Sequence, residues 1–169
     1  MKILLLGHGQ AGKDTCAELL RDHAGISFRS SSEAACEIAV FPWLSGLYGY
    51  ETPEECFADR RNHRQEWKDL ITQYNTPDKA RLCREIIATN DCYVGMRCPE
   101  EFAASRHLFG LVLWVDASKR LPPDPTMLIE RDENMILIDN NHGKEDLADE
   151  LFWLISTIQR LQIRVRHAA

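Results

Sequence analysis

The chain has 169 residues, 44% of them hydrophobic and 27% charged, and this composition predicts one globular domain rather than a disordered tail. Its longest apolar runs, residues 3–6 and 111–115, are far shorter than the ~20 residues that span a bilayer, so we expect a cytoplasmic protein without a membrane segment. The 20 basic and 26 acidic side chains give a net charge of −6, which excludes a surface coated by nucleic acid but leaves room for a local basic patch. Six cysteines without a C-x-x-C pair predict reduced thiols and no zinc site.

In chain order, apolar runs that end at turns predict strands at 2–6, 26–28, 92–95, 111–115 and 135–138. Helical spacing and capping signals predict helices at 12–24, 33–39, 52–74, 78–89, 99–106 and 145–164. Thr52, followed by Pro53 and two acids, is a strong helix start, and Pro42 is expected to end the helix before it. Because strands alternate with helices, we expect an α/β fold: a parallel sheet of about five strands with helices on both faces, in one domain spanning residues 1–169.

Residues 7–13 read G-x-x-x-x-G-K and lie between the first predicted strand and the first predicted helix. Glycines let backbone N–H groups curl round a phosphate, the helix N-terminus adds partial positive charge, and the lysine reaches the terminal phosphates, so the sequence predicts a P-loop. The residues expected to bind ATP here are Gly7, His8, Gly9, Gln10, Ala11, Gly12, Lys13, Asp14 and Thr15. Two alternatives are a bare glycine turn and a dinucleotide site, but the latter needs an acid after the second strand, where residues 29–32 are arginine and serines.

The residues after the lysine depart from the common motif, because Asp14 comes first and the hydroxyl of Thr15 arrives one residue late. Thr15 is therefore the first magnesium candidate. Asp14 could act on the metal side or as a general base, since a carboxylate beside the phosphates needs a cation between them. The alternative for Asp14 is an ordinary acid at a helix N-terminus.

The most polar helical stretch runs from Asp59 to Trp67. Arg60 and Arg64 are four residues apart, as are Asp59 and His63, so each pair is expected to share a helix face. Guanidinium groups bind phosphate in bidentate fashion and an indole can stack on a base, so Arg60, His63, Arg64 and Trp67 form the predicted acceptor site. The alternative is a solvated face with internal ion pairs.

Five further positions follow predicted strands, at the sheet edge where α/β proteins bind ligands. Ser30 and Ser31 either bind an acceptor phosphate or cap the next helix, and Arg97 could bridge donor and acceptor phosphates. Asp116 is either a metal-side carboxylate or a turn cap. Asn141, in the turn after the last strand, is expected near the adenine of ATP.

Several of these segments carry a resemblance to a known family. Residues 7–15, 94–97 with 99–101, 114–116 and 138–143 together resemble bacteriophage deoxynucleoside monophosphate kinases, a thymidylate kinase-like group of P-loop kinases, over nearly the whole chain. The segments 48–50, 54–57, 59–60, 63–64, 74–75 and 93–97, with Trp67, are more similar to the phage branch that phosphorylates 5-hydroxymethyl-deoxyuridine in DNA.

The resemblance implies ATP and Mg²⁺ as cofactors, Lys13 on the donor phosphates, a helical acceptor-binding insertion at about 33–89, and a monomer or homodimer. Two features depart from the family. Gly95 stands where an acid often holds the metal side, and a proline-rich connection at 121–125 replaces the long mobile lid. A short lid is expected to leave the site open, which suits a polymeric acceptor.

Three hypotheses follow. In the first, the protein transfers the γ-phosphate of ATP to the 5-hydroxymethyl group of 5-hydroxymethyl-deoxyuridine in DNA: Lys13 and Arg97 stabilise the phosphoryl group, Asp59 or Asp14 accepts the alcohol proton, and the base is flipped out against Trp67. In the second, the acceptor is a free deoxynucleoside monophosphate. In the third, the protein binds nucleotide but transfers nothing.

Overall fold

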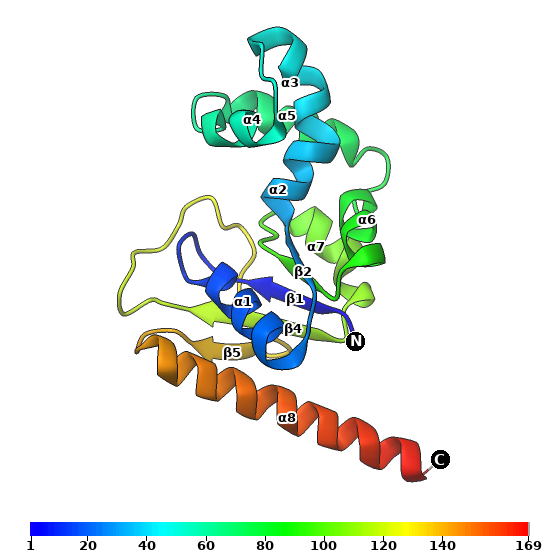
Figure 1. The fold of residues 1–169 in the computed structure, drawn as a ribbon, viewed down its shortest axis with the longest axis vertical. Coiled ribbons are helices and arrows are strands. Elements are labelled where there is room, and N and C mark those ends of the chain that lie inside the picture. Colours follow the sequence, from blue (N-terminus) through cyan, green and yellow to red (C-terminus); the bar gives the residue numbers. More distant parts are fainter. Residues whose placement is uncertain (169) are drawn as a thin grey trace.

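The core of the protein is a five-stranded parallel sheet with strand order β2-β3-β1-β4-β5 (Figure 1). This computed structural model describes the backbone of residues 1–168 and the side chains of residues 1–160. The strands are β1 (Ile3–Leu6), β2 (Phe28–Ser30), β3 (Cys92–Val94), β4 (Leu111–Asp116) and β5 (Ile136–Asp139). The predicted α/β fold is confirmed, and each strand lies within two residues of its predicted place.

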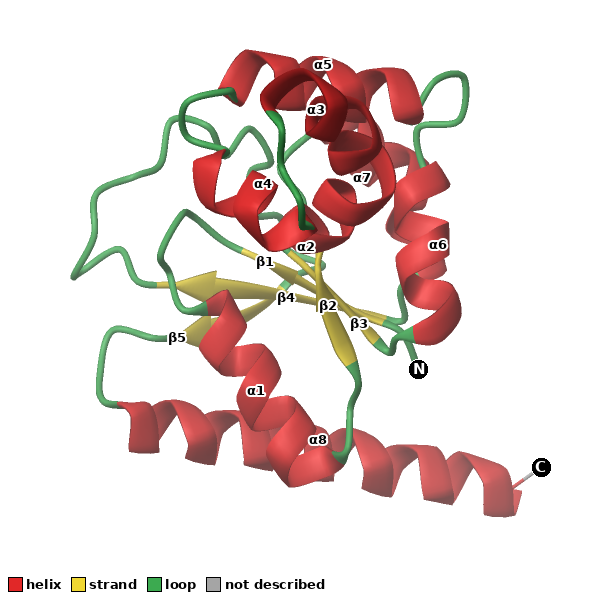
Figure 2. Cartoon of the chain, turned by 45° about the horizontal axis from the view of Figure 1, so that its top comes forward, coloured by secondary structure: helices red, strands yellow, loops and turns green. Residues whose placement is uncertain are grey.

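Helices cover both faces of this sheet (Figure 2). Helices α1 (Lys13–Ala24) and α8 (Lys144–Ala168) pack on one face, where Leu20 and Leu151 join the buried side chains of the strands. Helices α6 (Arg81–Thr89) and α7 (Pro99–Ser105), followed by the short turn η2 (Arg106–Leu108), lie on the other face with Tyr93. Alternate strand residues supply the two cores because successive side chains of a strand point to opposite faces.

The chain between β2 and α6 forms a helical lobe, residues 31–74, that stands away from the sheet (Figure 1). Its elements are α2 (Ser31–Ala35), the π-helical turn η1 (Cys36–Val40), α3 (Phe41–Tyr48), α4 (Pro53–Asp59) and α5 (Arg64–Tyr74). The lobe has a small core of its own around Val40, Leu44, Cys56 and Trp67.

Two expectations for the lobe were wrong. The helix does not end at Pro42: the π-helical turn directly before α3 widens the backbone, which removes the usual clash of a proline ring with the preceding turn. The expected single helix 52–74 is two helices, broken between Asp59 and Arg64. No helix in the described residues is long and apolar enough to cross a bilayer.

Candidate nucleotide-binding site

The loop from Gly7 to Gly12 joins β1 to α1 as a phosphate-binding loop must. Gly7 has φ 141°, and a Cβ there would lie 2.5 Å from the Val115 carbonyl oxygen on the neighbouring strand. Gly12 caps α1 with φ 92°. Because both positions need a left-handed backbone and close approach, glycine is required at each. The motif predicted from spacing is therefore built with the predicted backbone geometry.

Lys13 folds back across this loop. Its Nζ donates hydrogen bonds to the carbonyl oxygens of Gly7 at 2.9 Å and His8 at 2.6 Å. Burial lowers the pKa of Lys13, and the nearby charge of Arg97 lowers it further. A cation held inside the loop and shielded from water is well placed to meet phosphate oxygens.

Gly95 and Ser31 lie beside the lysine. The hydroxyl of Ser31 donates to the Gly95 carbonyl at 3.0 Å, and a Cβ on Gly95 would lie 3.9 Å from Cε of Lys13. Ser30 instead contacts Ser32, with 3.1 Å between the two hydroxyls, and caps α2 through its backbone alone. Of the two serines, the structure thus brings Ser31 close to the loop.

The connection between β4 and β5, residues 117–135, has no helix or strand, in agreement with its prolines. It does not leave the loop open, however, because Asp124 reaches the P-loop. Its Oδ2 accepts a hydrogen bond from the Gly9 amide at 3.0 Å, and its own amide donates to Nδ1 of His8 at 3.0 Å. Sequence analysis missed Asp124, since 115 positions separate it from Gly9.

Arg97 completes this arrangement. Following β3, it donates from Nη1 to Asp124 Oδ2 at 2.8 Å and also to the Thr126 hydroxyl. The structure therefore places Arg97 at the P-loop edge, at the carboxyl end of β3 where a phosphate-bridging cation was predicted.

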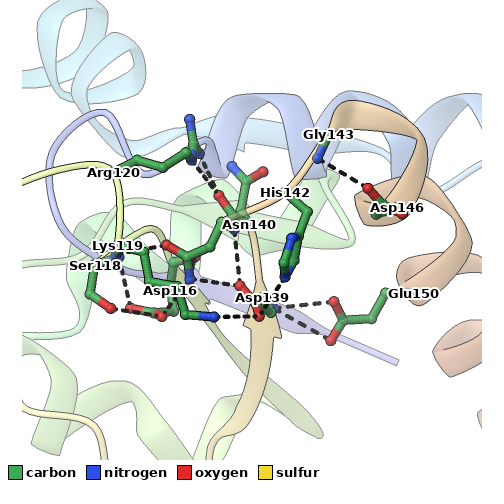
Figure 3. A network of polar contacts seen from close by, with 11 residues as sticks. Asp116, Ser118, Lys119, Arg120, Asp139, Asn140, His142, Gly143, Asp146 and Glu150 are labelled. Atoms are coloured by element: carbon green, nitrogen blue, oxygen red, sulfur yellow. Dashed lines mark hydrogen bonds and ion pairs between the residues drawn. The ribbon is translucent and has the colours of Figure 1, made fainter.

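A polar network ties the ends of β4 and β5 together (Figure 3). The Asp116 carboxylate caps a turn by accepting from the amide and hydroxyl of Ser118, as the turn-cap alternative predicts, and its role on the metal side stays a prediction. Asn141 donates to Asp116 at 2.9 Å and to Asp139 at 2.6 Å, and it accepts from the Lys119 amide at 2.8 Å. Its carboxamide is thus engaged inside the network, and its contact with adenine stays a prediction.

The neighbouring Asn140 supports the P-loop directly. Its side chain, 9% exposed, donates from Nδ2 to the Ala11 carbonyl at 2.8 Å, and a Cβ on Gly12 would lie 2.2 Å from the same nitrogen. Arg120 in turn holds the Asn140 carbonyl from Nε at 2.8 Å (Figure 3). The turn 140–143 was expected near the adenine, and the support that Asn140 gives to Ala11 has no local sequence signal because 129 positions separate the two residues.

Asp14 and Thr15 open α1 next to Lys13. Asp14 is exposed, Thr15 is half-buried, and in the described part of the chain neither side chain makes a hydrogen bond. Asp14 occupies the position after the lysine that ordinarily supplies an oxygen to Mg²⁺. No cluster of three or more metal-binding side chains exists in residues 1–160, and Mg²⁺ at a phosphate needs only one or two protein oxygens. Asp14 and Thr15 fit that requirement.

The predicted acceptor residues lie in the helical lobe, around the break between α4 and α5. Asp59 accepts hydrogen bonds from Tyr50, Asn62 and His63, the last at 3.1 Å. The hydrogen bonds from Tyr50 and Asn62 lower the pKa of Asp59. The ring of His63 stacks on Tyr48, with 4.0 Å between centroids. This network organises the tip of the lobe, and the role of Asp59 as proton acceptor stays a prediction.

The expectation for Trp67 needs correction. Its side chain is 7% exposed and packs at 6.0 Å between ring centroids against Phe57, so no open indole face is available for a base. The shared face expected for Arg60 and Arg64 is absent because the helix breaks between them. Arg60 stacks on Phe57 at 4.0 Å, while Arg61 and Arg64 are exposed and have no ion pair among the described residues.

An open cavity of about 320 Å³ lies at the base of the lobe, where α2 with η1, α4 and Arg29 of β2 meet, and its glutamates are exposed. Its lining residues are Arg29, Glu33, Cys36, Glu37, Pro53, Glu54, Phe57 and Ala58. Arg29 is held there by an ion pair with Glu37. The volume lies in the range of small-molecule sites.

The fold of the protein was compared with known protein families, sequences and solved structures. No protein-family model and no curated protein sequence matches the chain. A gluconokinase from Sinorhizobium meliloti 1021 is similar in structure, with 12% identity, a TM-score of 0.53 and 96% of each chain covered. A shikimate kinase from Aquifex aeolicus vf5 has 15% identity, a TM-score of 0.48 and coverage of 92% of this chain and 96% of that one. A sugar kinase from Janibacter sp. HTCC2649 has 17% identity, a TM-score of 0.45 and coverage of 90% and 93%. The protein has the P-loop kinase fold.

Proposed function

We propose that this protein is an ATP- and Mg²⁺-dependent kinase that transfers the γ-phosphate to the 5-hydroxymethyl group of 5-hydroxymethyl-deoxyuridine in DNA. The observation that carries the proposal is the P-loop with Lys13 folded inside it and Arg97 at its edge. A phosphoryl group held between these two cations is positioned and neutralised, which is most of what phosphoryl transfer requires.

The residues of the site have separate roles in this proposal. The backbone amides of the loop and Lys13 bind the donor phosphates, and Arg97 stabilises the charge on the group in transfer. Asp14 and Thr15 would hold Mg²⁺, which when bound neutralises further phosphate charge. Asn140 stabilises the loop through the hydrogen bond from its side chain to the Ala11 carbonyl.

The acceptor is proposed from the resemblance of the middle of the chain to DNA-modifying phage kinases, and from two features of the lobe. Exposed Arg61 and Arg64 have no ion pair in the described residues, so both are available to DNA phosphates. The 320 Å³ cavity has room for a base flipped out of a duplex, and Phe57 forms part of its lining.

The same cavity supports a second candidate, a free deoxynucleoside monophosphate. Glu33, Glu37 and Glu54 line it, and the net charge is −6; both features disfavour a long polyanion more than a single nucleotide. Arg29 is the cation at this cavity that could meet an acceptor phosphate.

The test is transfer of labelled γ-phosphate from ATP, with Lys13→Ala as the blank. An oligonucleotide containing 5-hydroxymethyl-deoxyuridine, the same oligonucleotide with thymidine, and a mixture of deoxynucleoside monophosphates are offered in parallel. We expect label only in the first. Label only in the free nucleotides would replace the proposal by the second candidate. Label in none, with ATP still bound, would make the protein a nucleotide-binding protein without transfer activity.

A further inference from the structure

The segment around Asp124 meets the P-loop where an anion is expected. Asp124 Oδ2 accepts from the Gly9 amide at 3.0 Å and from Arg97 at 2.8 Å. A backbone amide of the loop and the guanidinium of Arg97 are the groups that the proposed function assigns to phosphate oxygens. A carboxylate thus occupies part of the donor-phosphate site.

The contact is built from several directions. Thr126 donates to Asp124 Oδ1 from its amide at 2.9 Å and from its hydroxyl at 2.7 Å, so the carboxylate is oriented from behind. The amide of Asp124 bonds to His8 Nδ1, which is therefore the unprotonated nitrogen of that ring. A Cβ on Gly9 would lie 2.6 Å from Asp124 Oδ2, so there is no room for another atom between the two.

The carboxylate stays charged at working pH. The hydrogen bonds of Thr126, then the charge of Arg97, lower the pKa of Asp124 to about 2. Because its pKa is depressed, the stabilisation of the docked segment is present above about pH 3.8 and is lost only as the pH falls toward 2.

The segment that contacts the P-loop, residues 122–126, is short. Leu121 packs against the core beside α1, and Met127 is buried in the core on the other face of the sheet. These two side chains anchor the ends of the segment, so residues 122–126 can leave the loop without disturbing the sheet. Pro122, Pro123 and Pro125 stiffen it, which favours two discrete positions over a continuum.

We propose that Asp124 is an internal phosphate surrogate: it occupies the outer edge of the P-loop, and a nucleoside triphosphate binds only by displacing it. The inference rests on the proposed function, since it assumes that the loop binds ATP. Displacement frees Arg97 from Asp124 at the moment its guanidinium is needed for phosphate. Donor binding and opening of residues 122–126 are thus one event.

The test compares affinities for Mg-ATP and for inorganic tripolyphosphate by calorimetry in wild type, Asp124→Asn and Thr126→Val. A segment docked for nine-tenths of the time lowers apparent affinity about tenfold, so we expect Asp124→Asn to bind both ligands about tenfold more tightly. Thr126→Val keeps every charge but removes the hydroxyl that donates to the carboxylate and accepts from Arg97, while the Thr126 amide still holds Asp124, so it should tighten binding by a smaller factor. Asp132→Asn, which neutralises an exposed acid of the same connection, is the matched control and should change nothing.

The Gly9 amide resonance gives a second readout. In wild type its hydrogen bond to a carboxylate should shift the amide proton downfield, and Asp124→Ala, which has no side-chain acceptor, should remove that shift without any ligand. Equal ATP affinities in wild type and Asp124→Asn, or an unmoved Gly9 resonance, would overturn the inference. If neither wild type nor Asp124→Asn binds ATP better than Lys13→Ala, the proposed function itself fails.

Discussion

Replacing Asn140 by aspartate tests how the turn after β5 supports the P-loop. Asparagine and aspartate have the same shape, so the change removes one donor and adds one negative charge. In the native protein Nδ2 donates to the Ala11 carbonyl at 2.8 Å in a site where the side chain is 9% exposed. In Asn140→Asp a carboxylate oxygen would face that carbonyl oxygen, two acceptors with no proton between them.

The expected magnitude follows from this geometry. Leaving one buried acceptor without its donor costs about 1–3 kcal/mol of folding free energy. Asn140→Ala leaves only the Ala11 carbonyl unpaired, whereas Asn140→Asp adds a repelling carboxylate, so the aspartate variant should lie at the upper end of this range. Arg120 holds the backbone carbonyl of residue 140, not its side chain, and its hydrogen bond should survive in both variants.

Urea unfolding followed by circular dichroism measures the loss. Both variants should shift the midpoint at an unchanged slope, and both should weaken ATP binding because Ala11 and Gly12 lose their support. Asn134→Asp makes the same charge change at an exposed asparagine whose side chain has no hydrogen bond, and it serves as the control. If Asn140→Asp unfolds within about 0.5 kcal/mol of wild type, the hydrogen bond does not support the loop and the reasoning is refuted.

Two further predictions concern Glu101 and Trp67. Burial raises the pKa of Glu101, whose carboxylate accepts a hydrogen bond from the Tyr93 hydroxyl at 2.8 Å. The contribution of Glu101 to folding stability is therefore present below about pH 4.5 and is lost as the pH rises through the raised pKa. Glu101→Gln keeps an acceptor for Tyr93 without this titration, so the stability of the variant relative to wild type should rise between about pH 4 and pH 8. If the urea midpoints of wild type and variant change by the same amount between the two pH values, the prediction is contradicted. Trp67→Ala should cost about 3–5 kcal/mol in urea unfolding because it empties the core of the lobe. Trp67→Phe keeps an aromatic ring but loses core volume and an indole N–H that has no partner among the described residues, so it should cost less stability than Trp67→Ala and keep phosphotransfer. A selective loss of transfer to DNA in the folded variant would restore the stacking role for the indole.

Local patterns in the sequence determined the elements that carry the donor site. The strand, the glycines and the lysine of residues 3–13 specify β1, the P-loop and the start of α1, because an apolar run, a positive φ and a helix N-terminus depend on a few neighbouring residues. The N-cap at Thr52 and the irregular connection around its prolines were predicted for the same reason; Thr52 accepts from the Glu55 amide at 3.3 Å. The alternation of strands and helices along the chain was enough to predict the parallel sheet.

Only the tertiary structure decided which residues meet at the site and which are buried. Asp124 reaches Gly9, and Asn140 reaches Ala11, because strand order places the ends of β4 and β5 beside the P-loop, and no local period encodes a contact across more than a hundred residues. Trp67 lies on the apolar face of α5, and its burial depends on the packing of η1 against α5 and on its ring contact with Phe57 of α4. The helix is broken between Asp59 and Arg64, where the Asp59 carboxylate accepts hydrogen bonds from Tyr50, which precedes α4, and from His63 in the break, and the contact with Tyr50 depends on the fold of the lobe.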